Sequence, residues 1–204
     1  MISEALRNPK SLFDVSGKVA LITGASGAFG RACALMLASC GVKLVLVSGS
    51  QGELEEVAAE ARSLGADVRA VVRRPDTLAD AEFMLKAAVD AFGRVDQLVV
   101  ASGLNKAGFI QNQDYDAWQS VMDANVRGAW LMAKAVGAYW IREKIKGKML
   151  MVSSVRGRHG NYSGYTAYCT SKGATDALTR VLATEWAQHG ITVNAIAPTV
   201  FRSK

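Results

Sequence analysis

Residues Val19–Gly30, VALITGASGAFG, decide the fold of this chain. The run Val19–Thr23 is apolar up to its final threonine and does not alternate, which is typical of a strand buried on both faces. Gly24–Gly30 is rich in glycine, and Arg31–Cys40 then has helical spacing. A glycine turn between a buried strand and a helix is the context in which dinucleotides bind. The glycines allow close backbone approach to a pyrophosphate, and the helix N-terminus offers free N–H groups.

The same alternation of strand and helix repeats along the chain. Further strands are predicted at 43–47, 67–72, 97–101, 148–153 and 192–197. Further helices are predicted at 52–64, 78–92, 115–122, 125–144 and 164–189. Repeated strand–helix units with apolar strands predict an α/β fold with a doubly wound parallel sheet between two helix layers. Because no linker or composition shift interrupts the pattern, we expect one domain over residues 1–204, with 1–17 as an N-terminal arm.

Composition excludes several classes of protein. The 204 residues are 50% hydrophobic and 21% charged, which suits a globular domain with a sizeable core. No apolar run approaches the roughly 20 residues of a membrane helix, and residues 1–18 lack the apolar segment of a secretory signal. The net charge is +6, but the basic residues are spread along the chain, so we expect no nucleic-acid partner. Cys33, Cys40 and Cys169 have no metal-ligand spacing, which predicts no metal site and a reducing, cytoplasmic setting.

Tyr168 and Lys172 form a Y-x-x-x-K pair within the last predicted helix. Positions four apart lie on one helix face, so the phenol and the ammonium lie side by side. A nearby cation favours the phenolate and lowers the tyrosine pKa from its usual value near 10. The pair is therefore a candidate proton donor and acceptor for a carbonyl/alcohol couple. Alone, the same spacing also fits an ordinary solvated helix face.

Four features occur together in the order typical of one family. They are the Thr23-Gly24 turn, Asn125 within residues 124–128 (ANVRG), Ser153-Ser154 after the fifth strand, and Y-x-x-x-K. With these features, residues 18–198 resemble the short-chain dehydrogenase/reductase (SDR) family. The resemblance implies a Rossmann-type fold and an oxidoreductase that moves hydride between NAD(P)(H) and a carbonyl or secondary alcohol.

The resemblance also implies roles for single residues. Asn125, Ser154, Tyr168 and Lys172 match the family's catalytic tetrad. Tyr168 exchanges the proton, and Ser154 holds the substrate oxygen. Lys172 lowers the tyrosine pKa and holds the nicotinamide ribose, while Asn125 positions a relay water.

The expected cofactor-binding residues line the ends of several strands. They are Gly24, Ser26, Gly27, Phe29, Gly30, Ser48, Gly49, Ser50, Ala101, Ser102, Gly103, Tyr168, Lys172 and Pro198. After the second strand, residues 48–50 contain no acid to bind the ribose 2′-hydroxyl of NAD and no base for the 2′-phosphate of NADP. Two hydroxyls there can bind a phosphate, and Arg31 or Arg73 is a candidate for added charge. The sequence favours NADP(H) over NAD(H) by a small margin.

The sequence departs from the family in several places. Ala28 replaces the middle glycine of the turn, where a methyl group is expected to crowd the cofactor unless the turn shifts. Residues 100–103, VASG, replace the family's N-N-A-G, which predicts a less stable loop. The family's aspartate that contacts adenine after the third strand has no clear match in residues 72–76, VRRPD, and Pro198-Thr199 replaces Pro-Gly.

The family continues for several tens of residues past this point, into a substrate loop and a last strand. We therefore expect a longer active chain, and poor turnover from one that ends at Lys204. In the family, the helices equivalent to 125–144 and 164–189 pack between subunits, which implies a homodimer or homotetramer.

Three function classes stay open. The first is the oxidoreductase with a small-molecule alcohol or ketone substrate. The second is a non-catalytic dinucleotide-binding sensor or scaffold, and the third is a lyase or epimerase on the same fold. Arg156, Arg158 and His159 follow Ser154 and either bind an anionic substrate or form a solvated basic loop.

Overall fold

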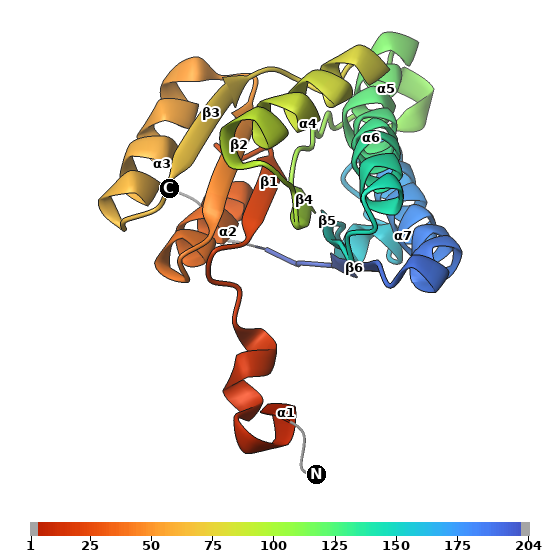
Figure 1. Cartoon of the computed structure of the whole chain (residues 1–204). Coiled ribbons are helices and arrows are strands. Elements are labelled where there is room, and N and C mark those ends of the chain that lie inside the picture. The colour runs from red at the N-terminus through yellow and green to blue at the C-terminus, as the bar shows by residue number, and fades with distance from the viewer. Residues whose placement is uncertain (1–3, 201–204) are drawn as a thin grey trace.

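The structure is a computed structural model that describes residues 4–200, and its centre is a six-stranded sheet (Figure 1). All pairings are parallel, in the order β3-β2-β1-β4-β5-β6. The strands are β1 (Val19–Thr23), β2 (Lys43–Ser48), β3 (Val68–Val72), β4 (Gln97–Val100), β5 (Lys148–Val152) and β6 (Thr192–Ile196). The predicted doubly wound parallel sheet is confirmed.

Helices connect the strands and cover both faces of the sheet. The main helices are α2 (Ala28–Ser39), α3 (Gln51–Ser63), α4 (Leu78–Phe92), α5 (Tyr115–Met122), α6 (Gly128–Arg142) and α7 (Thr166–Trp186). Short elements are α1 (Glu4–Arg7), η1 (Pro9–Phe13), η2 (Ile110–Asn112), η3 (Asp123–Arg127), η4 (Val155–Gly157) and η5 (Ala187–His189). Figure 1 shows α1 and η1 projecting from the body of the molecule.

Most element boundaries lie within one or two residues of the sequence prediction, and two helices differ more. The first helix begins at Ala28 rather than Arg31, because Gly27 takes the extended N-cap conformation. The helix predicted at 125–144 is one continuous rod from α5 through η3 into α6, and η3 is a turn of π-helix. The cap residues at both junctions keep helical dihedral angles, so nothing ends the rod there.

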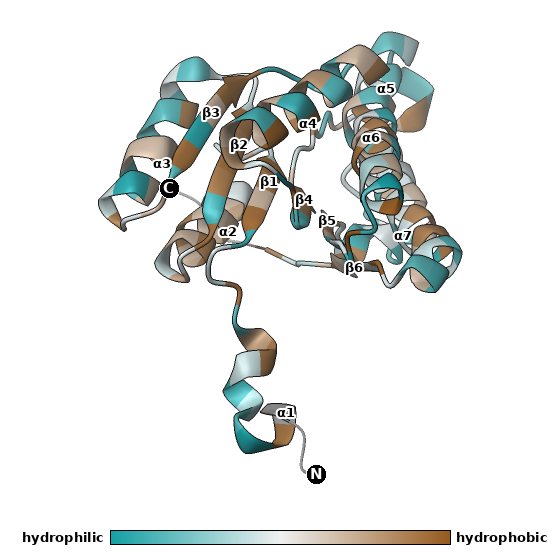
Figure 2. Cartoon of the chain, in the orientation of Figure 1, coloured by the Kyte–Doolittle hydropathy of each residue, from teal (hydrophilic) through white to brown (hydrophobic). Residues whose placement is uncertain are grey.

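The sheet separates two hydrophobic cores. Leu21 and Val45 face the core formed with α4, α6 and α7, whereas Ile22 and Leu46 face the core formed with α2 and α3. All five residues of β1 are buried, which explains why this strand shows no polar alternation. Figure 2 shows β1 and β2 mostly in the colours of hydrophobic residues.

The chain order reverses direction between β1 and β4. After β1 the chain moves outward to β2 and β3, and it then returns to place β4 on the other side of β1. The turns that leave β1 and β4 therefore diverge over opposite faces and leave a crevice at the strand ends. In open α/β sheets this switch point is where ligands bind.

Candidate functional site

A cleft of about 570 Å³ lies at the carboxyl ends of the strands. Its walls come from the turn after β1, the end of β2, the β3–α4 connection, the loop after β4, and η3. It brings together eight of the predicted cofactor residues, namely Gly24, Ser26, Gly27, Ser48, Gly49, Ala101, Ser102 and Gly103.

The turn after β1 depends on two glycines. Gly24 has a φ of +64°, and a Cβ there would overlap the backbone of Ser102. A Cβ at Gly30 would overlap the carbonyl oxygen of Gly24, so α2 can approach the turn only with glycine at that position. Gly27 caps α2, and the methyl-bearing Ala28 is already the first helical residue. The turn thus keeps the free N-terminus of α2 open toward the cleft.

Serine hydroxyls tie the turn to the end of β2. The Oγ atoms of Ser26 and Ser48 lie 2.7 Å apart, and Ser48 Oγ accepts a hydrogen bond from the Ser50 N–H at 3.2 Å. Ser48 is therefore already engaged in protein contacts. The Ser50 hydroxyl makes no capping bond to α3.

The loop after β4 is held by side chains other than the two amides of the family pattern. The Thr23 and Ser102 hydroxyls lie 3.2 Å apart, and the Ala101 N–H donates to the Thr23 carbonyl oxygen at 3.1 Å. Asn125 Oδ1 accepts from the Leu104 N–H at 2.7 Å, and its Nδ2 donates to the Leu104 carbonyl at 2.9 Å. Side chains of Thr23, Ser102 and Asn125 thus hold this loop without the two amides.

Asn125 joins this loop to α7. It lies within the π-helical turn η3 and is 3% exposed. Besides its two bonds to Leu104, its Nδ2 donates to Ser171 Oγ at 2.9 Å. A Cβ built on Gly103 would lie 3.3 Å from Asn125 Oδ1 and 3.7 Å from Lys172 Nζ. The loop after β4 thus passes directly beside the predicted catalytic residues.

Lys172 is buried and held in one position. Its Nζ donates to the Val152 carbonyl oxygen, at the end of β5, over 2.7 Å. Burial lowers the pKa of the Lys172 ammonium to about 8, and the Asp176 carboxylate one turn further along α7 opposes that shift. An ammonium with this pKa is a ready proton donor near neutral pH.

Tyr168 lies one helical turn before Lys172, with the Lys172 Nζ 5.6 Å from the centre of its ring. The two side chains are therefore neighbours on one face of α7. The two serines after β5 differ in their contacts. Ser153 is 2% exposed and its hydroxyl donates to the Lys172 carbonyl at 3.3 Å, which fixes α7. Ser154 Oγ accepts from the Arg156 N–H at 3.2 Å and reaches the Pro198 carbonyl at 3.5 Å.

Six predicted cofactor residues are not among the described residues that line the cleft. Tyr168 and Lys172 stand beyond Gly103, and Phe29 and Gly30 belong to the first turn of α2. Ser50 is the N-cap of α3, and the Pro198 carbonyl oxygen accepts a hydrogen bond from the loop after β5.

The two arginines considered for a phosphate already have acidic partners. Arg31 forms an ion pair with Glu60 on α3. Arg73 pairs with Asp80 at 3.3 Å, and its guanidinium lies 4.2 Å from the centre of the Phe83 ring. Arg74, whose side chain lies against Gly49, was not among the arginines expected at this site. No local motif marks it, because the contact depends on the pairing of β2 with β3.

Two arginines of the basic loop after Ser154 also have partners within the protein. Arg156 donates to the Gly160 carbonyl at 3.0 Å, and Arg158 Nε lies 3.6 Å from Asp176 Oδ2. Both contacts favour a structural role for these arginines over the capture of an anionic substrate.

Two further properties concern the described residues only. Within 4–200, no three acidic, histidine or cysteine side chains are grouped so that they could hold a metal ion. None of the helices in that range is both long and apolar enough to cross a membrane.

Comparison with known proteins gives the family. The sequence model described as short chain dehydrogenase matches residues 18–204. The chain belongs to the short-chain dehydrogenase family. A protein from Mycobacterium tuberculosis named an uncharacterized oxidoreductase is 49% identical over 192 residues, which cover 94% of this chain and 70% of that protein. A 3-oxoacyl-[acyl-carrier-protein] reductase of Synechocystis is 34% identical over 185 residues, 90% of this chain and 74% of that one.

Solved dehydrogenase structures agree with the fold. NAD⁺-bound xylitol dehydrogenase superposes with a TM-score of 0.89 at 33% identity, covering 93% of this chain and 72% of that chain. Carveol dehydrogenase from Mycobacterium avium, in complex with NAD, gives a TM-score of 0.85 at 26% identity, over 91% and 71% of the two chains. As a member of this family, the chain is an oxidoreductase.

Proposed function

We propose that this short-chain dehydrogenase transfers hydride between NAD(P)(H) and a carbonyl or secondary alcohol, with Tyr168 as the general acid and base. The observation that carries the proposal is the position of Lys172 and Asn125 beside Gly103, where the dinucleotide cleft ends, with Tyr168 one helical turn from Lys172. A proton-transfer group is thereby placed next to a site shaped for a cofactor that carries hydride.

The residues of the cleft fit a dinucleotide. Gly24 and Gly30 leave no room for side chains in the turn, and the N-terminus of α2 offers N–H groups to a pyrophosphate. The name of the xylitol dehydrogenase records bound NAD⁺, which supports the same use of the cleft here. When bound, the cofactor supplies or accepts the hydride.

The protein supplies the proton and the alignment. During reduction, Tyr168 donates its phenolic proton to the oxygen of the substrate carbonyl, and it takes a proton back during alcohol oxidation. Lys172, 5.6 Å from the centre of that ring, stabilises the phenolate by its charge. Ser154 holds the substrate oxygen opposite Tyr168 once its weak 3.5 Å contact with Pro198 is exchanged for the substrate.

Asn125 acts through its neighbours in this proposal. Its side chain fixes the loop after β4 against α7, which keeps Lys172 in place. A water at the π-helical turn η3, where regular helix bonding is interrupted, would complete the proton relay to Lys172.

The test is a screen for absorbance of the reduced nicotinamide, with NAD(H) and NADP(H), against a panel of alcohols, ketones and sugar acids. The expected result is turnover with at least one pair that depends on Tyr168. Cofactor binding with no turnover across the panel would favour a sensor or scaffold. Turnover without net cofactor oxidation or reduction would favour a lyase or epimerase.

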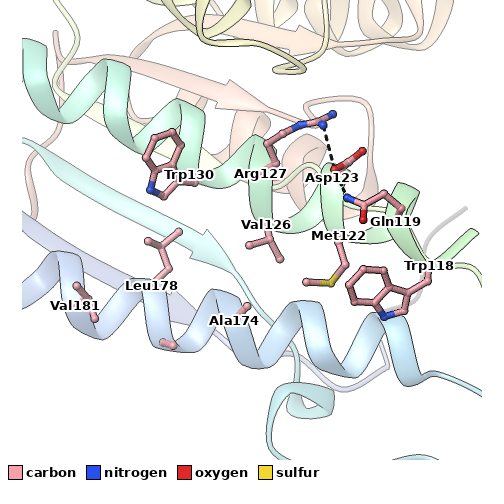
Figure 3. A pocket seen from close by; sticks show the side chains of 11 residues that line it. Trp118, Gln119, Met122, Asp123, Val126, Arg127, Trp130, Ala174, Leu178 and Val181 are labelled. Carbon is pink, nitrogen blue, oxygen red and sulfur yellow. Dashed lines mark hydrogen bonds and ion pairs between the residues drawn. The ribbon is translucent and has the colours of Figure 1, made fainter. Parts of the chain in front are cut away.

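An apolar groove of about 590 Å³ between the α5–η3–α6 rod and α7 supports a homo-oligomer (Figure 3). Trp118 and Trp130 stand at its two ends on the rod, and Leu178 and Val181 approach it from α7. Trp130 is 47% exposed and Val181 is 52% exposed. These are the helices that pack between subunits in the family, so we propose that a second copy of the chain covers the groove.

The three free cysteines suit a cytoplasmic setting, which we propose as well.

A further inference from the structure

The connection after β3 reaches the end of β2 and brings a cation with it. β2 and β3 are paired so that Ser48 lies opposite Val72, and the Arg73 N–H donates to the Ser48 carbonyl oxygen at 3.0 Å. The next residue, Arg74, therefore lies beside the end of β2. A Cβ built on Gly49 would overlap Arg74 Nε and would lie 3.2 Å from its Cζ. The guanidinium thus lies against the bare α-carbon of Gly49.

Arg74 differs from the other cations of the cleft. Three arginines line the described part of the cavity, and two of them already have acidic partners. Arg73 pairs with Asp80, and Arg127 pairs with Asp123 at 3.0 Å. Among the described residues no acid lies within ion-pair distance of Arg74, and Asp76, which also lines the cavity, does not pair with it. Its charge is available to a ligand.

The surroundings of Arg74 suit a phosphate. Ser48, Gly49 and Ser50 carry no negative charge at the end of β2. Ser50 is the N-cap of α3, its hydroxyl makes no capping bond, and the first N–H groups of the helix follow directly after it. The end of β2 is where the adenosine ribose lies in a doubly wound dinucleotide fold, and an arginine nearby accommodates the 2′-phosphate of NADP.

We propose that Arg74, supplied by the β3–α4 connection and seated on Gly49, is the residue that selects NADP(H) by binding its 2′-phosphate. This inference rests on the proposed dinucleotide function and adds the residue that sets cofactor choice. A planar guanidinium can give the phosphate two parallel, charge-assisted hydrogen bonds. Gly49 is part of this phosphate site because any side chain there would displace the Arg74 guanidinium.

The experiment measures binding of two adenosine probes by calorimetry, without any hydride chemistry. The probes are AMP and adenosine 2′,5′-bisphosphate, which differ only in the 2′-phosphate. For the unmodified chain we expect the bisphosphate to bind about tenfold or more tightly than AMP. Arg74→Gln should remove most of that preference while leaving AMP affinity unchanged. Arg74→Lys keeps the charge but loses the paired N–H donors of the guanidinium, so it should retain part of the preference for the bisphosphate.

The neighbouring Arg73→Gln is the matched control, since its charge is already paired with Asp80. It should change the preference less than Arg74→Gln does. Equal binding of the two probes by the unmodified chain, or an equal loss of both in Arg74→Gln, would overturn the role of Arg74 while leaving the dinucleotide site intact. If neither probe binds, the dinucleotide function itself fails, and this inference fails with it.

Discussion

The ammonium of Lys172 lies 5.6 Å from the centre of the Tyr168 ring, one turn away on the same face of α7. Lys172 is 5% exposed, and its hydrogen bond to the Val152 carbonyl anchors it to the end of β5. The charge beside the phenol is therefore fixed by the sheet as well as by the helix. This arrangement makes the proton chemistry of α7 testable residue by residue.

Replacing Tyr168 with Phe keeps the ring and removes the transferable proton. We expect turnover to fall by about 10²–10⁴-fold, with cofactor affinity little changed, because the hydroxyl acts in proton transfer. Steady-state kinetics and cofactor titration of the same preparation measure both quantities. A variant that keeps near-normal turnover would exclude Tyr168 as the acid and base.

Replacing Lys172 with Met should affect two properties together. The variant loses the charge that supports the phenolate and the group expected to hold the nicotinamide ribose. We expect weaker cofactor binding and an activity profile displaced to higher pH, because the phenolate forms less readily. If cofactor affinity and the pH profile both stay as in the parent chain, Lys172 has neither role.

Asp176→Asn tests the charge balance at Lys172. Burial lowers the pKa of Lys172 to about 8, and the Asp176 carboxylate raises it, so loss of that carboxylate should lower the pKa further. The ammonium would then lose its proton at a lower pH, and activity that depends on it should decline earlier on the alkaline side. The measurement is kcat/KM as a function of pH, and Asp176→Glu is the control that keeps the charge. An alkaline limb that moves to higher pH in the Asn variant would contradict this electrostatic role.

Gly49→Asp should shift cofactor preference toward NAD for two reasons. Its carboxylate repels a 2′-phosphate, and its Cβ must displace the Arg74 side chain that lies against Gly49. Gly49→Asn supplies similar bulk without the charge, so the difference between the two variants isolates the electrostatic part. The ratio of NADP to NAD efficiencies should fall about tenfold or more in the Asp variant. A ratio unchanged in both variants would mean that the end of β2 does not meet the ribose.

Val181→Glu places a charge in the apolar groove beside α7. If a second copy covers the groove, the charge is buried on association and should dissociate the oligomer. Light scattering coupled to size-exclusion chromatography measures the mass in solution. Met36→Glu, at a 65% exposed position on α2, is the control, and we expect it to leave the assembly unchanged. A parent chain that is monomeric at all concentrations would refute the proposed interface.

The sequence by itself determined the elements and their order. The non-alternating run Val19–Thr23 and the glycines after it predicted a buried strand and a turn, because burial on both faces and close backbone approach leave direct marks on residue choice. The spacing of Tyr168 and Lys172 likewise predicted their proximity, since the geometry of one helix fixes it.

Only the tertiary structure decided which distant residues meet. The contact of Arg74 with Gly49 depends on the register between β2 and β3, and the bonds from Asn125 to Leu104 and Ser171 depend on the sheet order. Such contacts join elements whose relative position is set by packing of the two cores. No short stretch of sequence encodes them. The sequence therefore pointed to Arg31 and Arg73, whose charges are paired with Glu60 and Asp80 in the structure, and not to Arg74.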